Sequence, residues 1–441
     1  MDEGETGDGS DNRMVTGVRA QRRALRADPA TVAVDVFVFA MKVFLAFFAL
    51  WAVVGTIVLQ VQGEGLGADS WRDVVVGGLA TGSIYGLIAL GYSMVYGILG
   101  FINFAHGEVF MTGAFSGYLM AGALFASGMW EANFPLAFVI VLIGAALTSM
   151  IVAITIEKVA YRRLRGAPRL IPLITSIGVS FFLQYAVLGL FGGNIKSYPQ
   201  LPVGLRERVN VLGFQVEGSK LVVIFVAAVS VVALWWFVSK SKSGRAIRAV
   251  AEDREIAGLM GIDVNRTIVK TFAVGGAMAG VAGIMWALLF RNIFFHTGFL
   301  PGIKAFTAAV LGGIGNLPGA MLGGLTLGMF EAAGPTMMAS LRWAIPTWVA
   351  HTIGAAALAG AVRGFLRFRQ GHVRDTGSAV GWMLVGSLFA LLAFTQLPGF
   401  QVVIPGTSQL KDMIAFLVLI GVLMARPAGL LGERLALEER G

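Results

Sequence analysis

Long apolar runs alternate with short polar segments along nearly the whole chain. Each run holds about 20 residues, the length that a helix needs to cross about 30 Å of hydrocarbon. The runs lie roughly at 36–60, 73–99, 105–127, 134–156, 169–192, 219–239, 266–290, 304–333, 342–362, 378–397 and 411–425. This pattern predicts an all-α, polytopic membrane protein with about ten spanning helices.

Composition agrees with a membrane protein and excludes several kinds of site. With 56% hydrophobic residues, 13% charged residues and a mean hydropathy of +0.77, the 441-residue chain has too little polar surface for a soluble globule. It has no cysteine, which rules out disulfides and thiolate metal sites. The net charge of +9 comes from basic residues between the apolar runs. We therefore expect the lipid bilayer, and not a nucleic acid, to be the partner of this surface.

The chain begins with a polar segment and an additional apolar run. Residues 1–34 are acidic and glycine-rich at first and then rich in arginine, which predicts a disordered cytoplasmic tail. The run that follows is too long for a signal-peptide core and lacks a small-residue cleavage site. Residues 35–60 are therefore predicted to form a retained transmembrane helix.

Basic segments between the runs predict the orientation of the chain. Residues 157–169, 239–254, 362–374 and the surroundings of Arg426 should all be cytoplasmic. These positions agree only if residues 304–333 make an even number of passes. Glycines and a proline at the centre of that run would break a helix, and they are Gly312, Gly313, Gly315, Pro318 and Gly319. We predict a re-entrant pair of half-helices of roughly 13 residues each, about 20 Å long, lining a pathway because broken backbone at membrane depth needs protein or water around it.

Glycines spaced by four residues mark predicted contact faces between helices. Gly78, Gly82 and Gly86 share one face of the run at 73–99, and Gly276 with Gly280 repeats the spacing. Small residues in this spacing let helix backbones approach closely in lipid. These two runs should cross in opposite directions, each followed by a glycine-rich polar break, which suggests the inverted repeats of transporters.

Two apparent nucleotide-binding motifs fail on inspection. In "GFQVEGSK" (213–220) serine precedes the lysine, whereas a phosphate-binding loop needs lysine before serine or threonine. In "GGIGNLPG" (312–319) proline replaces the third glycine of a dinucleotide fingerprint and no βαβ unit surrounds it. We expect no cofactor and no catalytic residues.

The stretch "FINFAHGEVFM" (101–111) places Asn103, His106 and Glu108 close together in an apolar chain. Ionisable residues at membrane depth usually face a bundle interior or a cavity, and Glu331 is the other main acid there. A metal site is not expected, because His106 and Glu108 lie two residues apart and no third ligand is near. The polar residues either line a pathway or clamp helices together, with Glu108 bonded to His106 or to amides of the broken segment. The pathway set is Tyr85, Tyr92, Asn103, His106, Glu108 and Asn316.

Several segments together resemble one transporter family. They are "GSIYGLIALGYSMVYGILGFINFAHGEVFMTGAF" (82–115), "RLIPLITSIGVSFFLQYAVL" (169–188), "SKSGRAIRAVAEDREIAGLMGIDVNRTI" (241–268), "GIKAFTAAVLGGIGNLPGAMLGGLTLGMFEA" (302–332) and "KDMIAFLVLIGVLMARPAGLLGE" (411–433). They are similar to the permease subunit of branched-chain amino acid ABC importers, specifically the shorter of its two permease types. The resemblance spans roughly 72–334 and 409–433.

This resemblance implies an organisation and a set of partners. Residues 72–333 would be the permease core, 335–408 an inserted helix pair and 409–433 the last core helix with its cytoplasmic end. The partners would be a second homologous permease, two cytoplasmic ATPases and an extracytoplasmic substrate-binding protein. The chain would lie in the inner membrane of a prokaryote with both termini cytoplasmic, and it would not itself be an enzyme.

The charged segment 241–266 is the predicted surface for the ATPases. It should form a short helix with Ala249, Ile256 and Met260 on a docking side, broken at Gly258 and Gly261. Its downstream part lacks the proline common in importer coupling motifs, and a purely orienting role is the alternative. The candidate coupling residues are Arg245, Arg248, Ala249, Ala251, Glu252, Ile256, Gly258, Met260 and Gly261.

Three functions remain open at this point. The first is import of branched-chain or related hydrophobic amino acids, and the second is import of urea or short amides by the same fold. The third is ion-coupled secondary transport, which ordinarily uses several acids within the membrane. The presence of two main acids counts against the third.

Overall fold

The computed structural model describes residues 52–61, 65–168, 170–211, 214–337, 411–426 and 428–432, together with isolated positions elsewhere. It divides into two compact units, Met1–Met337 with Lys411–Gly441, and Met338–Leu410. The predicted tail at 1–34 lies outside the described residues, as do nearly all of the predicted runs at 342–362 and 378–397. In the second unit, β5 (Arg342–Trp343) pairs antiparallel with β6 (Val402–Val403).

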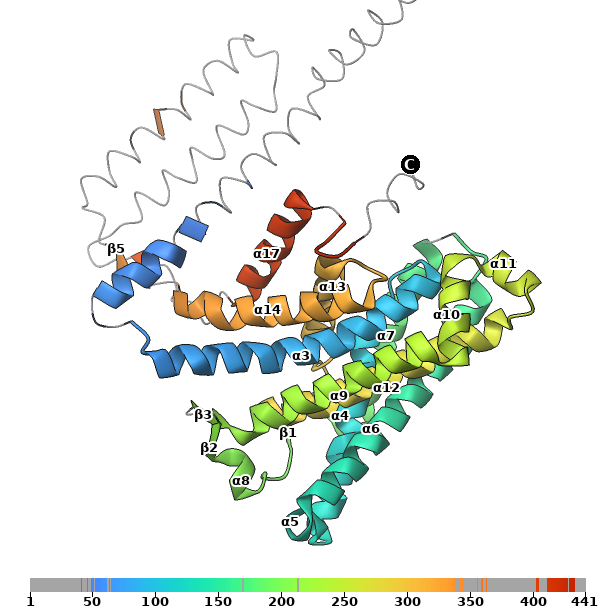
Figure 1. Cartoon of the computed structure of the whole chain (residues 1–441), viewed down its shortest axis with the longest axis horizontal. Coiled ribbons are helices and arrows are strands. Elements are labelled where there is room, and N and C mark those ends of the chain that lie inside the picture. Colours follow the sequence, from blue (N-terminus) through green and yellow to red (C-terminus); the bar gives the residue numbers. More distant parts are fainter. Residues whose placement is uncertain are drawn as a thin grey trace, which may run out of the picture. The chain divides into compact units, whose positions relative to one another are not determined.

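The first unit is a helical bundle with short strands in its loops (Figure 1). Its helices are α3 (Ala68–Leu99), α4 (His106–Ala126), α5 (Met129–Ala132), α6 (Phe134–Ile156), η1 (Glu157–Tyr161), η2 (Arg162–Leu164), α7 (Leu170–Phe191), α8 (Val203–Arg206), α9 (Gly218–Lys240), α10 (Lys242–Glu252), α11 (Arg254–Leu259), α12 (Val264–Phe290), α13 (Phe299–Gly312), α14 (Leu317–Met337) and α17 (Lys411–Ala425). Its strands are β1 (Lys196–Ser197), β2 (Arg208–Val211), β3 (Phe214–Glu217) and β4 (Asn292–Ile293).

Helices long and apolar enough to cross a membrane number 6 in the described part of the chain. They cover Asp69–Leu99, His106–Ala126, Phe134–Leu164, Leu170–Phe191, Gly218–Lys240 and Val264–Phe290. The mostly helical, polytopic architecture is therefore confirmed. The predicted total of about ten spans is not confirmed, because Ala52–Val61 and Phe299–Gly312 are shorter apolar helices and other runs lie outside the described residues.

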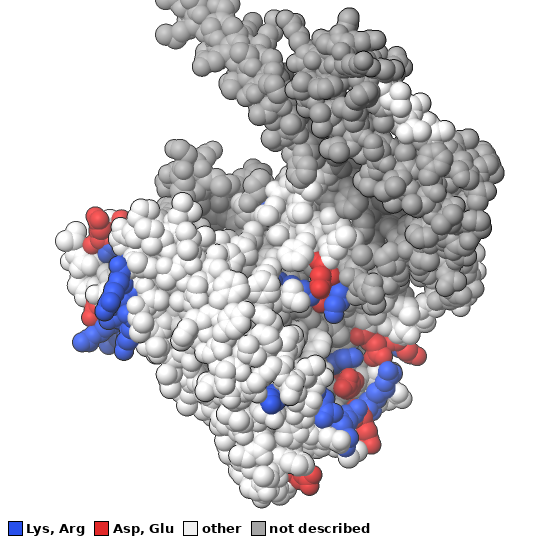
Figure 2. All heavy atoms as spheres, turned by 180° about the vertical axis from the view of Figure 1, so that it is seen from behind, with Lys and Arg blue, Asp and Glu red and all other residues white. Residues whose placement is uncertain are grey.

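Uncharged surface dominates this unit, as a lipid-facing bundle requires. Figure 2 shows charged side chains gathered in separate groups, with broad areas between them that carry none. Many large apolar side chains of this unit are exposed, including Phe182 at 70% and Phe225 at 69%. Exposed apolar patches of this size mark contact with membrane or protein.

The predicted glycine face of α3 lies against α14, and the two helices run side by side (Figure 1). A β-carbon at Gly82 would lie 2.8 Å from the Cα of Leu325 and 2.9 Å from the carbonyl oxygen of Gly324. One at Gly78 would lie 3.1 Å from the Cα of Met329. Only glycine allows backbones to pass at these distances.

A second glycine contact joins α12 to α6. A β-carbon at Gly276 would lie 2.8 Å from the carbonyl oxygen of Ser149, and one at Gly280 would lie 2.8 Å from the Cα of Ala146. Two sets of helices share this arrangement, α3–α4–α6 and α12–α13–α14. The first helix of one set, α3, packs on α14, and the first helix of the other set, α12, packs on α6. This exchange is compatible with the suggested inverted repeats, which stay a prediction.

The predicted break in the run at 304–333 is present, but its two halves differ in length. Helix α13 ends at Gly312 and α14 begins at Leu317, and Gly313 takes a φ of 104°, which favours glycine. Helix α14 has 21 residues, so the expected half-helix of roughly 13 is wrong for this part. Pro318 lies in the first turn of α14, where proline is tolerated. Gly319 likewise continues the helix, packed against Gly312.

Contacts between loops show which helix ends lie on the same side of the bundle. Strand β1 follows α7 and pairs with β4, which follows α12, so the ends of both helices lie on one side. Arg165, after α6, bonds to Asn265 at the start of α12, which places these residues on the other side. This sorting agrees with the predicted topology, and which side faces the cytoplasm stays a prediction.

Candidate functional site

Two chain breaks from opposite sides of the bundle meet at its centre. The segment between α3 and α4 ends beside the segment between α12 and α13. A β-carbon at Gly107 would lie 2.6 Å from the carbonyl oxygen of Gly298 and 2.9 Å from the Cα of Gly302. Nearby, the backbones of Gly91 and Gly275 bring α3 and α12 into contact. The N-terminal ends of α4 and α13 therefore converge inside the bundle.

A cavity of about 310 Å³ lies at this meeting point. Its walls come from α3, α4, α7, the start of α13 and the preceding segments, and they are mostly apolar. Phe181 and Phe299, which line it, are 48% and 46% exposed, so the cavity opens toward the surface of the described bundle. The lining residues are Tyr92, Phe104, Glu108, Ile177, Ser180, Phe181, Gly298, Phe299, Gly302 and Ile303.

Glu108 supplies the carboxylate of this cavity and is only 1% exposed. Its Oε1 accepts hydrogen bonds from Gln184 Nε2 at 2.7 Å and from Ser180 Oγ at 3.4 Å, both on α7. The expected bond to His106 or to the broken segment is therefore wrong. Among the described residues Oε2 has no hydrogen-bond partner, and it lies beside Gly298. This oxygen is available to a positively charged or hydrogen-bonding group in the cavity.

Asn103 and His106 are buried beside the cavity and support the segments around it. Asn103 Oδ1 accepts from the Tyr161 hydroxyl at 2.6 Å and from the Ala105 amide at 3.2 Å. His106 packs against Gly91 and meets Tyr92 edge to face, with ring centroids 4.9 Å apart. Neither residue lines the cavity, so of the three polar residues selected from the stretch 101–111 only Glu108 does.

Tyr85 belongs to a different polar cluster, which the sequence analysis missed. Lys304, 5% exposed, lies at 2.8 Å from Glu331 Oε1 and at 2.6 Å from Asp412 Oδ1, and it donates to the Tyr85 hydroxyl at 3.4 Å. The cluster joins α3, α13, α14 and α17. Lys304 stands as an isolated basic residue at the start of an apolar run, which is the signal that could have identified it.

Asn316 also lies outside the cavity. Its Oδ1 accepts from the Gly319 amide at 3.1 Å, in the first turn of α14. Its Nδ2 donates to the Leu431 carbonyl at 2.9 Å. The residue joins the break between α13 and α14 to the C-terminal segment, where Leu430 and Leu431 donate to carbonyls at the end of α13.

The geometry describes a membrane bundle with a mostly apolar cavity that opens toward its surface. Within the described residues no group of three or more possible metal ligands exists. The family profile described as "Branched-chain amino acid transport system / permease component" matches residues 74–348. The chain belongs to this family. It is a multi-pass membrane protein, and its relatives are transport permeases, not enzymes.

Individual relatives agree with this assignment. The high-affinity branched-chain amino acid transport system permease protein BraD of Pseudomonas aeruginosa is 44% identical over 262 residues, 59% of this chain and 85% of BraD. The corresponding LivH protein of Escherichia coli K12 is 44% identical over 260 residues, 58% of this chain and 83% of LivH. A probable LivH of Methanocaldococcus jannaschii is 28% identical over 266 residues, 59% of this chain and 79% of that protein. No solved structure matches this permease significantly.

The candidate ATPase surface of the permease forms two helices, α10 and α11. The break between them is at Asp253, whose side chain accepts from the amides of Glu255 and Ile256, and Gly258 continues α11, contrary to expectation. Ile256 is 59% and Met260 77% exposed, as a docking side requires.

The inner side of the same segment faces the bundle. Ala249 packs against the core, so its predicted place on the docking side is wrong. Leu259, which the sequence analysis did not select, is 87% exposed. Ala251, Glu252, Arg245 and the turn at Gly261 are exposed, while Arg248 donates to the carbonyl of Val238.

Proposed function

We propose that this permease is a subunit of an ATP-driven importer of branched-chain or related hydrophobic amino acids in a prokaryotic inner membrane. It would form the pathway with a second homologous permease. Two cytoplasmic ATPases and an extracytoplasmic binding protein would complete the importer, with both termini of this chain in the cytoplasm. Family membership and the names of the 44% identical relatives support this proposal.

The observation that carries the proposal is a carboxylate oxygen without a partner in an apolar cavity. An aliphatic amino acid has an ammonium group that needs a negative partner and a side chain that favours apolar walls. Glu108 Oε2 offers the first, and Ile177, Phe181 and Ile303 offer the second. The cavity volume of about 310 Å³ lies at the lower end of the range of small-molecule pockets.

Replacement of Glu108 by glutamine tests this role. The amide keeps the size of the side chain and removes its charge. We expect leucine uptake per inserted molecule to fall by about tenfold or more, the effect of losing a charged hydrogen bond. Radiolabelled leucine uptake in cells that lack other leucine importers measures it, normalised to protein in the membrane.

Glu131→Gln is the matched control, because Glu131 is an exposed acid on α5 outside the cavity. Equal uptake by the Glu108 variant and the wild type would contradict the pathway role. The alternative substrate class is tested in the same cells. Competition of leucine uptake by excess urea, which has no ammonium group, would support import of urea or short amides.

The ATPase surface is tested by a triple variant with Ala251, Ile256 and Met260 changed to aspartate. It keeps every lysine and arginine, so the orienting charges remain. We expect normal insertion, but loss of ATPase co-purification and of uptake, because the three aspartates would place uncompensated negative charges in the apolar centre of the contact. Unchanged co-purification and uptake would leave α10 and α11 with an orienting role alone.

A further inference from the structure

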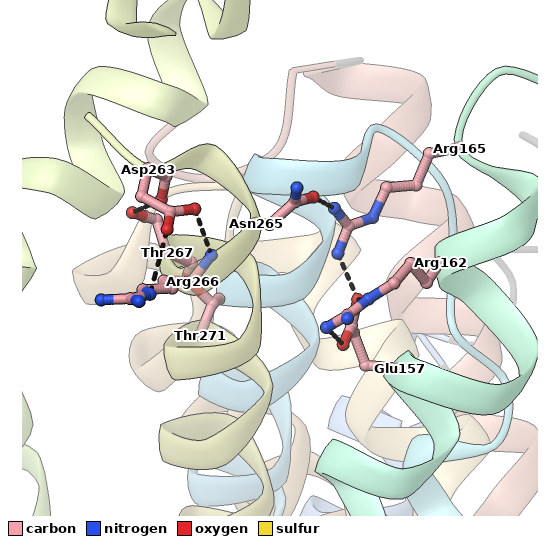
Figure 3. Close-up of polar contacts among 8 residues, drawn as sticks. All are labelled: Glu157, Arg162, Arg165, Asp263, Asn265, Arg266, Thr267 and Thr271. Atoms are coloured by element: carbon pink, nitrogen blue, oxygen red, sulfur yellow. Dashed lines mark hydrogen bonds and ion pairs between the residues drawn. The ribbon is translucent and has the colours of Figure 1, made fainter. Parts of the chain in front are cut away.

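A buried carboxylate lies where α6 passes into η1. Glu157 is 0% exposed and begins the π-helical turn that ends at Tyr161. It pairs with Arg162 at 3.0 Å and with Arg165, and Figure 3 shows both guanidinium groups converging on it. π-Helical turns are rare and frequently occur at functional sites. The two arginines compensate the buried charge and so stabilise this turn.

Two contacts join the predicted cytoplasmic segments to the bundle, one to the residues that follow the turn and one to the end of α3. Arg165 also donates to Asn265 in the first turn of α12, beside the Asp263 that caps the same helix (Figure 3). Arg254, the first residue of α11, donates to the carbonyl of Ile98 near the end of α3. Burial and the nearby charge of Arg165 lower the pKa of Arg254, so the two arginines lie close enough for their charges to interact.

Tyr161 connects the turn to the cavity. Its hydroxyl donates to Asn103 Oδ1 at 2.6 Å, and its ring meets Phe101 edge to face at 5.4 Å. Asn103 in turn accepts from the amide of Ala105, the residue before α4. Since Glu108 lies in the first turn of α4, a displacement of Tyr161 changes the support of the cavity carboxylate.

We propose that Glu157, Tyr161 and Asn103 are positioning residues that transmit movement of α10 and α11 to the cavity. This proposal rests on the function proposed above. One arm runs from α11 through Arg254 to the end of α3, and the other runs from α12 through Arg165 to η1. The first arm thus ends at Ile98 in the last turn of α3, and the second continues from η1 through Tyr161 to Asn103, between α3 and α4. Chains of packed side chains and hydrogen bonds can carry coupling between separate sites when they have two arrangements.

Tyr161→Phe tests the proposal, because it removes one hydroxyl and keeps the ring contacts. The complete importer, reconstituted in liposomes, is assayed for ATP hydrolysis and leucine uptake. We expect the ATP hydrolysed per leucine imported to rise by about fivefold, the factor that corresponds to one net hydrogen bond. A merely structural role would lower both activities together and leave their ratio unchanged.

Tyr198→Phe is the matched control. The Tyr198 hydroxyl donates to the carbonyl of Ala114, also on α4, but from the segment at β1, on the opposite side of the bundle. Burial raises the pKa of Tyr198, so its hydroxyl is a neutral donor. We expect the ratio of ATP to leucine in this variant to match the wild type.

A second measurement does not require the substrate. The chain has no cysteine, so Phe299→Cys places a single thiol at the cavity mouth. ATP should change its labelling rate in the wild-type and Tyr198→Phe backgrounds and leave it unchanged with Tyr161→Phe. If Tyr161→Phe keeps the wild-type ratio of ATP to leucine and also keeps the ATP-dependent change in labelling, the proposed transmission through Tyr161 is wrong. Absence of leucine uptake by the wild-type complex would overturn the proposed function instead, and the labelling would still test the transmission.

Discussion

Replacing Lys304 with methionine removes the cation of the cluster that joins α13, α14 and α17. The ammonium group lies at 2.8 Å from Glu331 and at 2.6 Å from Asp412, and the Lys304 and Glu331 side chains are only 7% and 10% exposed. Methionine fills much of the same volume, so the loss is mainly electrostatic. Removing one partner of a buried ion pair costs about 3–5 kcal/mol, because the remaining charge is left uncompensated.

Thermal unfolding of the detergent-solubilised permease, followed by size-exclusion chromatography, measures this loss. Lys220→Met is the control, because Lys220 lies 3.8 Å from Glu217 and these side chains are 26% and 45% exposed. An exposed pair of this kind contributes at most about 1 kcal/mol. We therefore expect a much larger fall in unfolding temperature for Lys304→Met.

A triple variant separates charge from packing. Combining Lys304→Met with Glu331→Gln and Asp412→Asn leaves no uncompensated charge, and replacing a whole buried ion cluster is often close to neutral. We expect this variant to regain most of the lost stability. If Lys304→Met unfolds at the temperature of the Lys220→Met control, or if the neutral variant is the least stable of the set, the electrostatic reasoning is wrong.

Two further predictions concern packing and topology. Gly82→Ala should destabilise the bundle by about 1–3 kcal/mol by forcing α3 from α14, whereas Gly97→Ala, with nothing within 4 Å of the added carbon, should not; equal unfolding temperatures would refute the close contact. For topology, Thr336→Cys should react with an impermeant thiol reagent from outside and Gly371→Cys should not, and the reverse pattern would overturn the proposed orientation.

Local features of the sequence were enough to predict much of the bundle. Apolar runs of membrane length became α3, α4, α6, α7, α9 and α12, because each element depends mainly on its own residues. The break after Gly312 was also predicted, because glycines disfavour helix. One of them, Gly313, adopts a positive φ. The residue at which α14 begins was not predicted. Pro318 and Gly319 can lie in the first turn of a helix, and only packing decides whether they do.

The cavity and its supports depend on contacts between distant residues. Gln184 and Ser180 lie in an apolar helix, and nothing in its sequence indicates that they bind Glu108. Tyr161 meets Asn103 across 58 positions of the chain. Such pairs follow from how the helices pack, so sequence reasoning found the acid but assigned it the wrong partners.

The Lys304 cluster also bears on how α14 and α17 are held together. Helix α14 ends at Met337 and α17 begins at Lys411, and Lys304 bonds to Glu331 near the first end and to Asp412 near the second. Both α14 and α17 are therefore held against α13 by ion pairs that do not depend on the segment between them. We therefore expect that a shorter connection between Met337 and Lys411 would leave α14 and α17 in the same place.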